Sequence, residues 1–352
     1  MMRIALTADP EIPVPPRHYG GIERIVDMLA RALVERGHEV TLFSHPASEC
    51  PVSRAAWPGA DSLSTSDTVR NAVTLARHVM AGRFDIVHSF SRIAYMMPIL
   101  PFPVPKIMTY QRAITPRSVK LGHTLSRGTL AFTAISDWMM RDVAGIGRWY
   151  VVPNGVPLDT YTFVPHVSER APLVFLGRVE EIKGPHLAIE IARRAGCPLV
   201  IAGNIPDEHR AWAEAHVLAH VDGEAVRYIG SADDAQKNAL LGAAAAMLMP
   251  IVWDEPFGIV MAEAMACGTP VLGLRRGAVP EVVEDRITGF VRDDVDGLVA
   301  AVHQLSDIDR AACRARVAQL YSAEAVVEGY LGVYRSVIGV GKNAVGEQCA
   351  SA

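Results

Sequence analysis

Apolar residues along this chain form two kinds of pattern, short continuous runs and stretches that repeat every three or four positions. The first run covers residues 3–7, and after a Pro-rich loop the residues of 22–36 place their apolar side chains on one helical face. A short apolar run predicts a buried strand, and a period of 3.6 predicts an amphipathic helix. A second apolar run follows at 40–43. This opening therefore predicts a strand, a helix and a parallel strand of the same sheet.

The same alternation continues through the rest of the chain. Further strands are expected at 85–88, 103–110, 130–135, 149–152, 173–176, 199–202, 226–229, 246–250, 270–272 and 290–291. Further helices are expected at 68–81, 184–195, 207–219, 234–243, 259–266, 279–284, 296–305 and 308–319. Periodicity is lost over the turn-rich residues 159–172, where we place a linker. The pattern predicts an α/β protein with two Rossmann-like, doubly wound domains, over residues 1–160 and 170–320, that face each other across a cleft.

Length and charge agree with two domains and exclude several classes of protein. The chain has 352 residues, of which 50% are hydrophobic and 20% are charged, so it can bury two cores and is not a disordered chain. A net charge of −4 gives no support to a nucleic-acid binder that relies on a basic face.

The cysteines and the N-terminal residues indicate the cellular compartment in which the protein is expected. The five cysteines show no zinc-binding spacing, and their odd, sparse count favours a reducing environment. The N-terminus lacks the long apolar core of a signal peptide, and the longest uncharged run, 238–253, is too short to span a bilayer. We therefore expect a cytoplasmic protein without a metal site or a transmembrane segment.

Two cations follow the strand expected at 173–176. Arg178 comes directly after it, and Lys183 precedes the next helix. Ligands of open parallel sheets bind beyond the carboxyl ends of the strands, and a planar guanidinium with a mobile ammonium suits a diphosphate. The alternative is a solvated turn with two ordinary charges, which Glu180 and Glu181 would partly neutralise.

Two carboxylates flank the start of the helix expected at 259–266. Helical rise would separate Glu255 and Glu263 by about 12 Å at most, which is too far for a glycosidase pair. The spacing suits a ligand with hydroxyl groups at both ends of a phosphate bridge. The free N–H groups of Phe257, Gly258 and Ile259 would then face the phosphates. The alternative is an acidic first turn and one exposed glutamate.

Two features of the first domain have weaker signals. Gly20 and Gly21 lie between the first strand and the first helix, where glycine lets a backbone approach a ligand closely, although a plain turn explains them equally. They do not form a dinucleotide-binding GxGxxG motif. His88 ends a strand, where it would touch a substrate as a catalytic residue or serve a structural role.

Together these segments resemble the retaining glycosyltransferases of family four, which have the two-domain GT-B fold. The resemblance covers nearly the whole chain and is most specific in the E-x7-E segment. It is carried by GGIERIVDMLARALVERGHEVTLF, FTAIS, VVPNGV, FLGRVEEIKGPHLAIEIA and MPIVWDEPFGIVMAEAMACGTPVLGLRRGAVPEVVEDRITGFV. Residues 321–338 resemble the family's final helix, which crosses back onto the first domain.

The resemblance implies a role for each motif. Arg178 and Lys183 would bind the donor diphosphate, Glu255 the donor sugar and Glu263 the ribose. The remaining donor contacts would be made mostly by backbone. They comprise the base-side residues Tyr228, Ile229 and Gly230, the N–H groups of Phe257, Gly258 and Ile259, and the phosphate-side glycines Gly20 and Gly21.

The resemblance also implies a mechanism without metal or other cofactor. The donor substrate would be a nucleotide-diphosphate sugar, with UDP or GDP as the expected nucleotide. Two cations and a helix N-terminus would neutralise the leaving group, and the acceptor would attack from the face that the leaving group occupies. Two positions depart from the family pattern. Phe90 replaces the second histidine of His-x-His, and Gln111 lies where many relatives have the histidine of Leu-His-Gly.

Two other functions stay open at this point. Phe90 is the best argument for a non-catalytic sugar-nucleotide-binding module, and a GT-B-fold sugar-nucleotide epimerase would need a carboxylate and histidine pair that the chain does not clearly offer. The acceptor (a sugar, a lipid-linked sugar or a natural product) is not indicated. A cluster of cations in the first domain leaves peripheral membrane contact open, namely Arg112, Arg117, Lys120 and Arg127.

Overall fold

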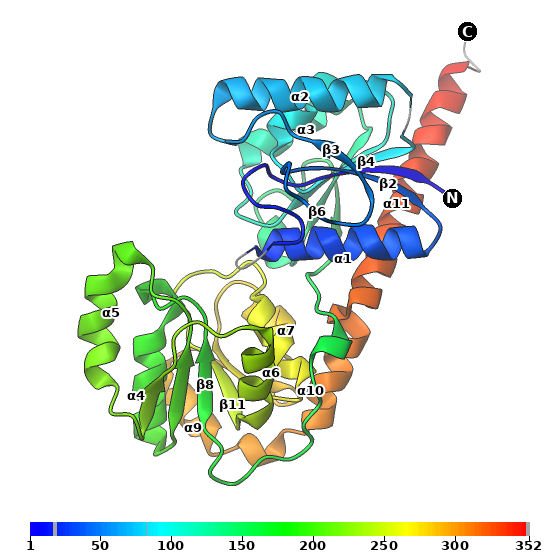
Figure 1. Ribbon diagram of the computed structural model, residues 1–352. Coiled ribbons are helices and arrows are strands. Elements are labelled where there is room, and N and C mark those ends of the chain that lie inside the picture. Colours follow the sequence, from blue (N-terminus) through cyan, green and yellow to red (C-terminus); the bar gives the residue numbers. More distant parts are fainter. Residues whose placement is uncertain (17–19, 83, 350–352) are drawn as a thin grey trace. The chain divides into compact units, whose positions relative to one another are not determined.

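The computed structural model describes residues 1–16, 20–82 and 84–349, which form two compact units (Figure 1). Unit 1 consists of Met1–Pro153 and Val326–Ala352, and unit 2 of Asn154–Ala325. The expected linker at 159–172 therefore lies inside unit 2. It is held there by hydrogen bonds such as that from the N–H of Val164 to the carbonyl oxygen of Cys267. A turn-rich segment with no apolar period can still pack on a domain through its backbone.

Unit 1 is built on a parallel sheet. Within the described residues its strand order is β3-β2-β1-β4-β5-β6-β7. The strands are β1 (Arg3–Thr7), β2 (Glu39–Ser44), β3 (Ser53–Ala56), β4 (Ile86–Ser89), β5 (Lys106–Tyr110), β6 (Leu130–Ala134) and β7 (Arg148–Val151). The helices are α1 (Gly21–Glu35), α2 (Thr65–Met80), the 3-10 helix η1 (Ile93–Ile99), α3 (Pro116–Ser126) and most of α11 (Ala323–Cys349).

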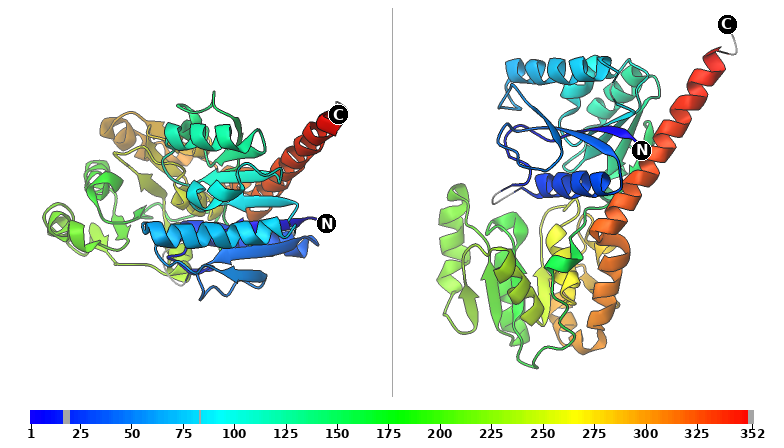
Figure 2. Two further views of the ribbon diagram at one scale, coloured as in Figure 1. Left: turned by 90° about the horizontal axis from the view of Figure 1, so that it is seen from above. Right: turned by 45° about the vertical axis from the view of Figure 1, so that its right-hand side comes forward.

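The two faces of this sheet bury different elements. Figure 1 shows α1 and α2 on opposite sides of the strands. Along β4, Val87 belongs to the apolar core that also contains residues of α2, η1 and α3. The next side chain, His88, points the other way and packs against α11. Both views of Figure 2 show α11 as one long helix, and it extends beyond the expected 321–338 to Cys349.

Two elements of unit 1 were missed from the sequence pattern. Strand β3 has the sequence SRAA and is largely exposed at the sheet edge, so it has no apolar run. Helix α3 buries Val119, Gly122 and Ser126, which do not form a recognisable hydrophobic stripe. In both cases pairing or packing with neighbouring elements stabilises the segment, although its own sequence has no hydrophobic pattern.

Unit 2 is also built on a parallel sheet, whose strand order is β10-β9-β8-β11-β12-β13. Its strands are β8 (Leu173–Leu176), β9 (Leu199–Ala202), β10 (Val226–Tyr228), β11 (Ala246–Met249), β12 (Val271–Leu274) and β13 (Gly289–Arg292). Its helices are α4 (Pro185–Ala195), α5 (Arg210–His216), α6 (Asp234–Ala243), α7 (Ile259–Ala266), α8 (Val279–Val282), α9 (Val295–Val302) and α10 (Arg310–Arg316). The α/β class is confirmed, and α6 and α7 have the expected bounds.

Candidate active site

The centre of the candidate site in unit 2 is an ion pair between the loops that follow β8 and β11. The Lys183 Nζ donates to Glu255 Oε2 at 2.7 Å. Only 18% of the lysine side chain and 12% of the glutamate side chain are exposed. The two groups are therefore not independently solvated, because each neutralises the other. A phosphate ligand would have to share the ammonium with Glu255.

Backbone contacts bring these two loops together. The N–H of Val252 donates to the carbonyl oxygen of Ile182 at 3.0 Å. Gly184 has φ +76°, and a Cβ on it would lie 2.0 Å from the carbonyl oxygen of Pro250. Only glycine fits this approach. The backbone on both sides of Lys183 is therefore held closely against the loop that follows β11.

Glu255 is held from its other side by the loop after β12. Its carbonyl oxygen accepts from the N–H of Ala278 at 2.8 Å. Gly277 has φ +52°, and a Cβ there would lie 2.3 Å from the same carbonyl oxygen. The backbone of Glu255 is thus fixed before any ligand binds, which is the preorganisation that a catalytic site needs.

Arg178 has a separate partner. Its guanidinium lies 2.8 Å from Glu180 Oε1, and the second carboxylate oxygen lies 3.3 Å from His209 Nε2. Glu180 is only 3% exposed, whereas 41% of the Arg178 side chain faces solvent. Arg178 therefore keeps exposed N–H groups for a ligand, while Glu180 partly neutralises it.

The start of α7 supplies a further polar element beside Glu255. Gly258 precedes the helix with φ +74°, and Ile259 is its first residue. The first N–H groups of a helix have no intrahelical partner and attract anions. Phe257 contributes only backbone here, because its ring is buried against Tyr321 with centroids 5.4 Å apart.

Glu263, one turn further along α7, is nearly buried and already has two donors. Tyr161 Oη donates to Glu263 Oε1 at 2.7 Å, and Lys237 Nζ lies 2.9 Å from the same oxygen. Burial lowers the pKa of Lys237, but Glu263 and Asp234 outweigh this and leave that pKa raised. Sequence reasoning missed both partners, because they lie 102 and 26 positions from Glu263 and nothing local marks either as a contact.

The residues expected to face a base lie at the same edge of the sheet. Ile229 is exposed, and the carbonyl oxygen of Gly230 accepts from the N–H of Gly203 at 2.7 Å. Tyr228 Oη donates to the carbonyl oxygen of Gly203 at 2.8 Å. A Cβ on Gly203 would lie 1.8 Å from the carbonyl oxygen of Gly177, so this glycine links the loops after β8, β9 and β10.

His88 does not face open space. It is fully buried in unit 1, with Nδ1 2.8 Å from Tyr334 Oη and Nε2 2.6 Å from Thr109 Oγ1. Burial lowers its pKa to about 3. The expectation of a catalytic histidine is wrong for this structure, because both ring nitrogens are bonded within unit 1. Phe90 packs on the same ring at 4.3 Å and is equally enclosed.

This burial makes unit 1 sensitive to acid. In the unfolded chain the imidazole takes up a proton below its ordinary pKa of 6.5, whereas in the folded chain it stays neutral down to about pH 3. Stability therefore falls as the pH drops through this window, by about 2 kcal/mol at pH 5. We expect urea unfolding of a His88→Gln variant to lack this part of the pH slope between pH 7 and 5. Equal slopes in both proteins would contradict the assignment.

The glycine loop of unit 1 lies at the N-terminus of α1. A Cβ on Gly20 would lie 2.6 Å from Pro16 and 2.8 Å from Glu23, whereas one on Gly21 would meet nothing within 4 Å. Beside this loop, Asp9 follows β1, and burial together with Glu11 raises its pKa to about 6. Asp9 was not recognised from the sequence, because a single acidic residue before a Pro-rich loop carries no motif.

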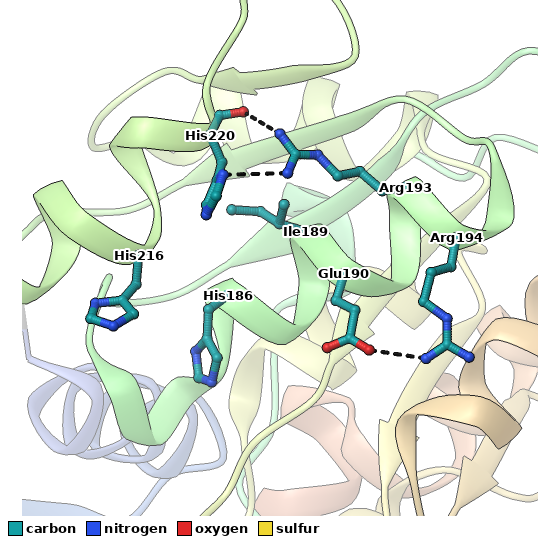
Figure 3. A pocket seen from close by; sticks show the side chains of 7 residues that line it. All are labelled: His186, Ile189, Glu190, Arg193, Arg194, His216 and His220. Carbon is teal, nitrogen blue, oxygen red and sulfur yellow. Dashed lines mark hydrogen bonds and ion pairs between the residues drawn. The ribbon is translucent and has the colours of Figure 1, made fainter.

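A groove of about 330 Å³ opens elsewhere on unit 2 (Figure 3). Its residues come from α4, α5 and the short helix after α5, and include none of the expected site residues. They are His186, Ile189, Glu190, Arg193, Arg194, His216 and His220. Both arginines are already engaged, Arg193 with His220 and Arg194 with Glu190. Within the described residues, no group of three His, Cys, Asp or Glu side chains could hold a metal ion.

Comparison with known proteins identifies the class of enzyme. Residues 19–160 match the family model described as Glycosyltransferase Family 4, and residues 163–318 match Glycosyl transferases group 1. The chain is 26% identical to a phosphatidyl-myo-inositol mannosyltransferase of Mycolicibacterium smegmatis, covering 97% of this chain and 95% of that protein. It is 29% identical to a glycogen synthase of Mycobacterium tuberculosis over 85% of this chain and 86% of that one.

Solved structures agree on the fold. A glycosyltransferase from Rickettsia africae is similar with a TM-score of 0.80 at 17% identity, covering 96% of this chain and 98% of that one. Anabaena HepE, solved with UDP and glucose, has a TM-score of 0.70 at 19% identity, and the match covers 96% of this chain and 100% of that one. The protein is a glycosyltransferase with the GT-B fold. It belongs to glycosyltransferase family 4.

Proposed function

We propose that this protein is a retaining hexosyltransferase that uses a nucleotide-diphosphate sugar and needs no metal ion. The observation that carries the proposal is the preorganised Lys183–Glu255 pair beside the N-terminus of α7. With Arg178 nearby in sequence and exposed, unit 2 supplies two cations and free N–H groups for a diphosphate. UDP-sugars and GDP-sugars are the proposed donors, and HepE was solved with UDP-glucose.

The reaction would break the bond between the anomeric carbon and the phosphate oxygen and form a bond from that carbon to an acceptor oxygen. Charge develops on the departing diphosphate, where Lys183 and Arg178 would stabilise it. The acceptor proton would pass to the departing phosphate oxygen, so the step balances without a protein base. Glu255 would hold sugar hydroxyl groups, and Glu263 the ribose.

Nucleotide release from UDP-, GDP-, ADP- and dTDP-sugars tests this function. Release that requires an acceptor, with a product of unchanged anomeric configuration by NMR, supports retaining transfer. Tight donor binding without turnover on a broad acceptor panel favours the sugar-nucleotide-binding module. Conversion of the donor sugar without an acceptor favours the epimerase.

We also propose that unit 1 contacts anionic membrane surfaces. Between Asp85 and Asp137 the sequence contains no acidic residue. Helix η1 packs between α2 and α3, and these helices together with the residues that flank them expose both apolar and cationic side chains. The apolar members are Leu63, Val69, Val73, Met80, Phe102 and Leu121, and the cations are Arg77, Arg117, Lys120 and Arg127. Within the described residues none of these cations has an ion pair, and no helix could span a membrane.

Sedimentation with vesicles tests this contact. Each cation near an anionic bilayer contributes about 5-fold in affinity, so the combined Arg117→Ser, Lys120→Ser and Arg127→Ser variant should bind roughly 100-fold more weakly to phosphatidylglycerol vesicles. Binding should also fall in 500 mM salt. A control lacking the exposed cations Arg54 and Arg170 should bind like the wild type. Equal binding by both variants would contradict the proposal.

A further inference from the structure

Trp253 is an aromatic residue of the candidate site that the proposed roles do not use. It follows β11 in the loop that leads to Glu255, and it is half-buried. The Lys183 Nζ lies 4.6 Å from the centroid of its ring. The neighbouring Val252 is hydrogen-bonded to Ile182, so the tryptophan is placed against the lysine by backbone as well as by side chain.

The polar edge of this indole does not explain its position. Its Nε1 is buried and has no hydrogen-bond partner within the described residues. An unpaired buried donor costs stability, and a phenylalanine would avoid that cost. What the ring does offer is its face, which attracts the ammonium of Lys183 through the negative lobe of the π system.

Two side chains therefore contact the Lys183 ammonium, and they differ in charge. Glu255 carries a negative charge and would compete with a diphosphate for the ammonium. The neutral ring of Trp253 would not compete, because it attracts the cation without a charge of its own. We propose that Trp253 is a positioning residue that keeps the Lys183 ammonium in place while it is shared between Glu255 and the departing diphosphate. This inference rests on the proposed function.

Paired variants separate the ring face from the indole N–H. Trp253→Leu removes both and should lower kcat about 10-fold, within the range of a partly desolvated cation–π contact. Trp253→Phe keeps a ring face and should stay within about 3-fold of the wild type. Because the lysine acts on the leaving group, kcat should fall more than the donor KM rises. Trp212→Leu, at another half-buried tryptophan of unit 2, should leave kcat unchanged.

Combining Trp253→Leu with Lys183→Ala tests whether the effect of Trp253 on kcat depends on Lys183. If Trp253 acts through Lys183, then Trp253→Leu should cost nothing further in a Lys183→Ala protein. An equal loss in both backgrounds, or a Phe variant as slow as the Leu variant with normal thermal unfolding, would overturn the inference. If Lys183→Ala itself leaves donor turnover unchanged, the proposed function fails instead, so the two failures are distinguishable.

Discussion

Replacing Lys183 with alanine is expected to lower kcat with a nucleotide-sugar donor by about 10² or more. The ammonium would stabilise charge that develops on the leaving diphosphate, and removing one such preorganised contact costs a factor of this size. Glu255→Gln should have a loss of similar size, because the amide keeps the shape but not the charge that accepts sugar hydroxyl groups and pairs with Lys183. Steady-state release of the nucleotide measures both.

The ion pair also changes what is expected for stability. The Lys183 and Glu255 side chains are mostly buried, so Lys183→Ala leaves the Glu255 carboxylate without its partner and should lower the free energy of unfolding by about 1–3 kcal/mol. Activity must therefore be compared at a temperature where both proteins are folded.

The control uses a different ion pair of unit 2, one that contains an arginine. Arg194 pairs with Glu190 and Asp296 on the exposed surface, and Arg194→Ala should leave kcat unchanged. Near-wild-type turnover in Lys183→Ala or Glu255→Gln would contradict the assignment of these residues to the donor site.

Glu263→Gln is expected to raise the KM for the donor by about 10- to 100-fold. Hydrogen bonds to a charged carboxylate are worth about 1.5–3 kcal/mol, and the ribose that it would hold is remote from the reacting carbon. The substitution should therefore affect binding of donor and transition state alike, so that kcat changes little. Titration of the nucleoside diphosphate by calorimetry should show the same loss.

Tyr161→Phe provides the graded comparison. It removes one donor to Glu263 but leaves the carboxylate and Lys237 in place, so the donor KM should rise less than about 5-fold. If Glu263→Gln weakens folding but leaves nucleotide affinity intact, the carboxylate is a structural partner of Tyr161 and Lys237 only.

The order of elements could be read from the sequence where each element has its own hydrophobic signal. Helices α6 and α7 and strand β1 have the expected bounds, since their caps and apolar runs are local. Strand β3 and helix α3 were missed because partners elsewhere in the chain stabilise them. The linker was misplaced for a related reason, because a segment without periodicity can belong to a domain through backbone hydrogen bonds.

The candidate site was predicted as a set of residues but not as a set of partners. Arg178, Lys183, Glu255 and Glu263 could be named from their position after strands and at a helix start. Their ion pairs could not, because Lys183 and Glu255 are 72 positions apart and meet only where adjacent strands of a parallel sheet end. Trp253 was missed for the same reason.

By itself, the sequence determined the class of the protein: two α/β units, and a donor-side motif with cations and carboxylates after strands. Those features follow from local periodicity and from the rule that parallel strands end at one edge. Only the tertiary structure decided which charges neutralise each other and that His88 is enclosed against α11 rather than exposed. Burial and pairing depend on contacts between distant segments, and these set both pKa values and the stability that each side chain contributes.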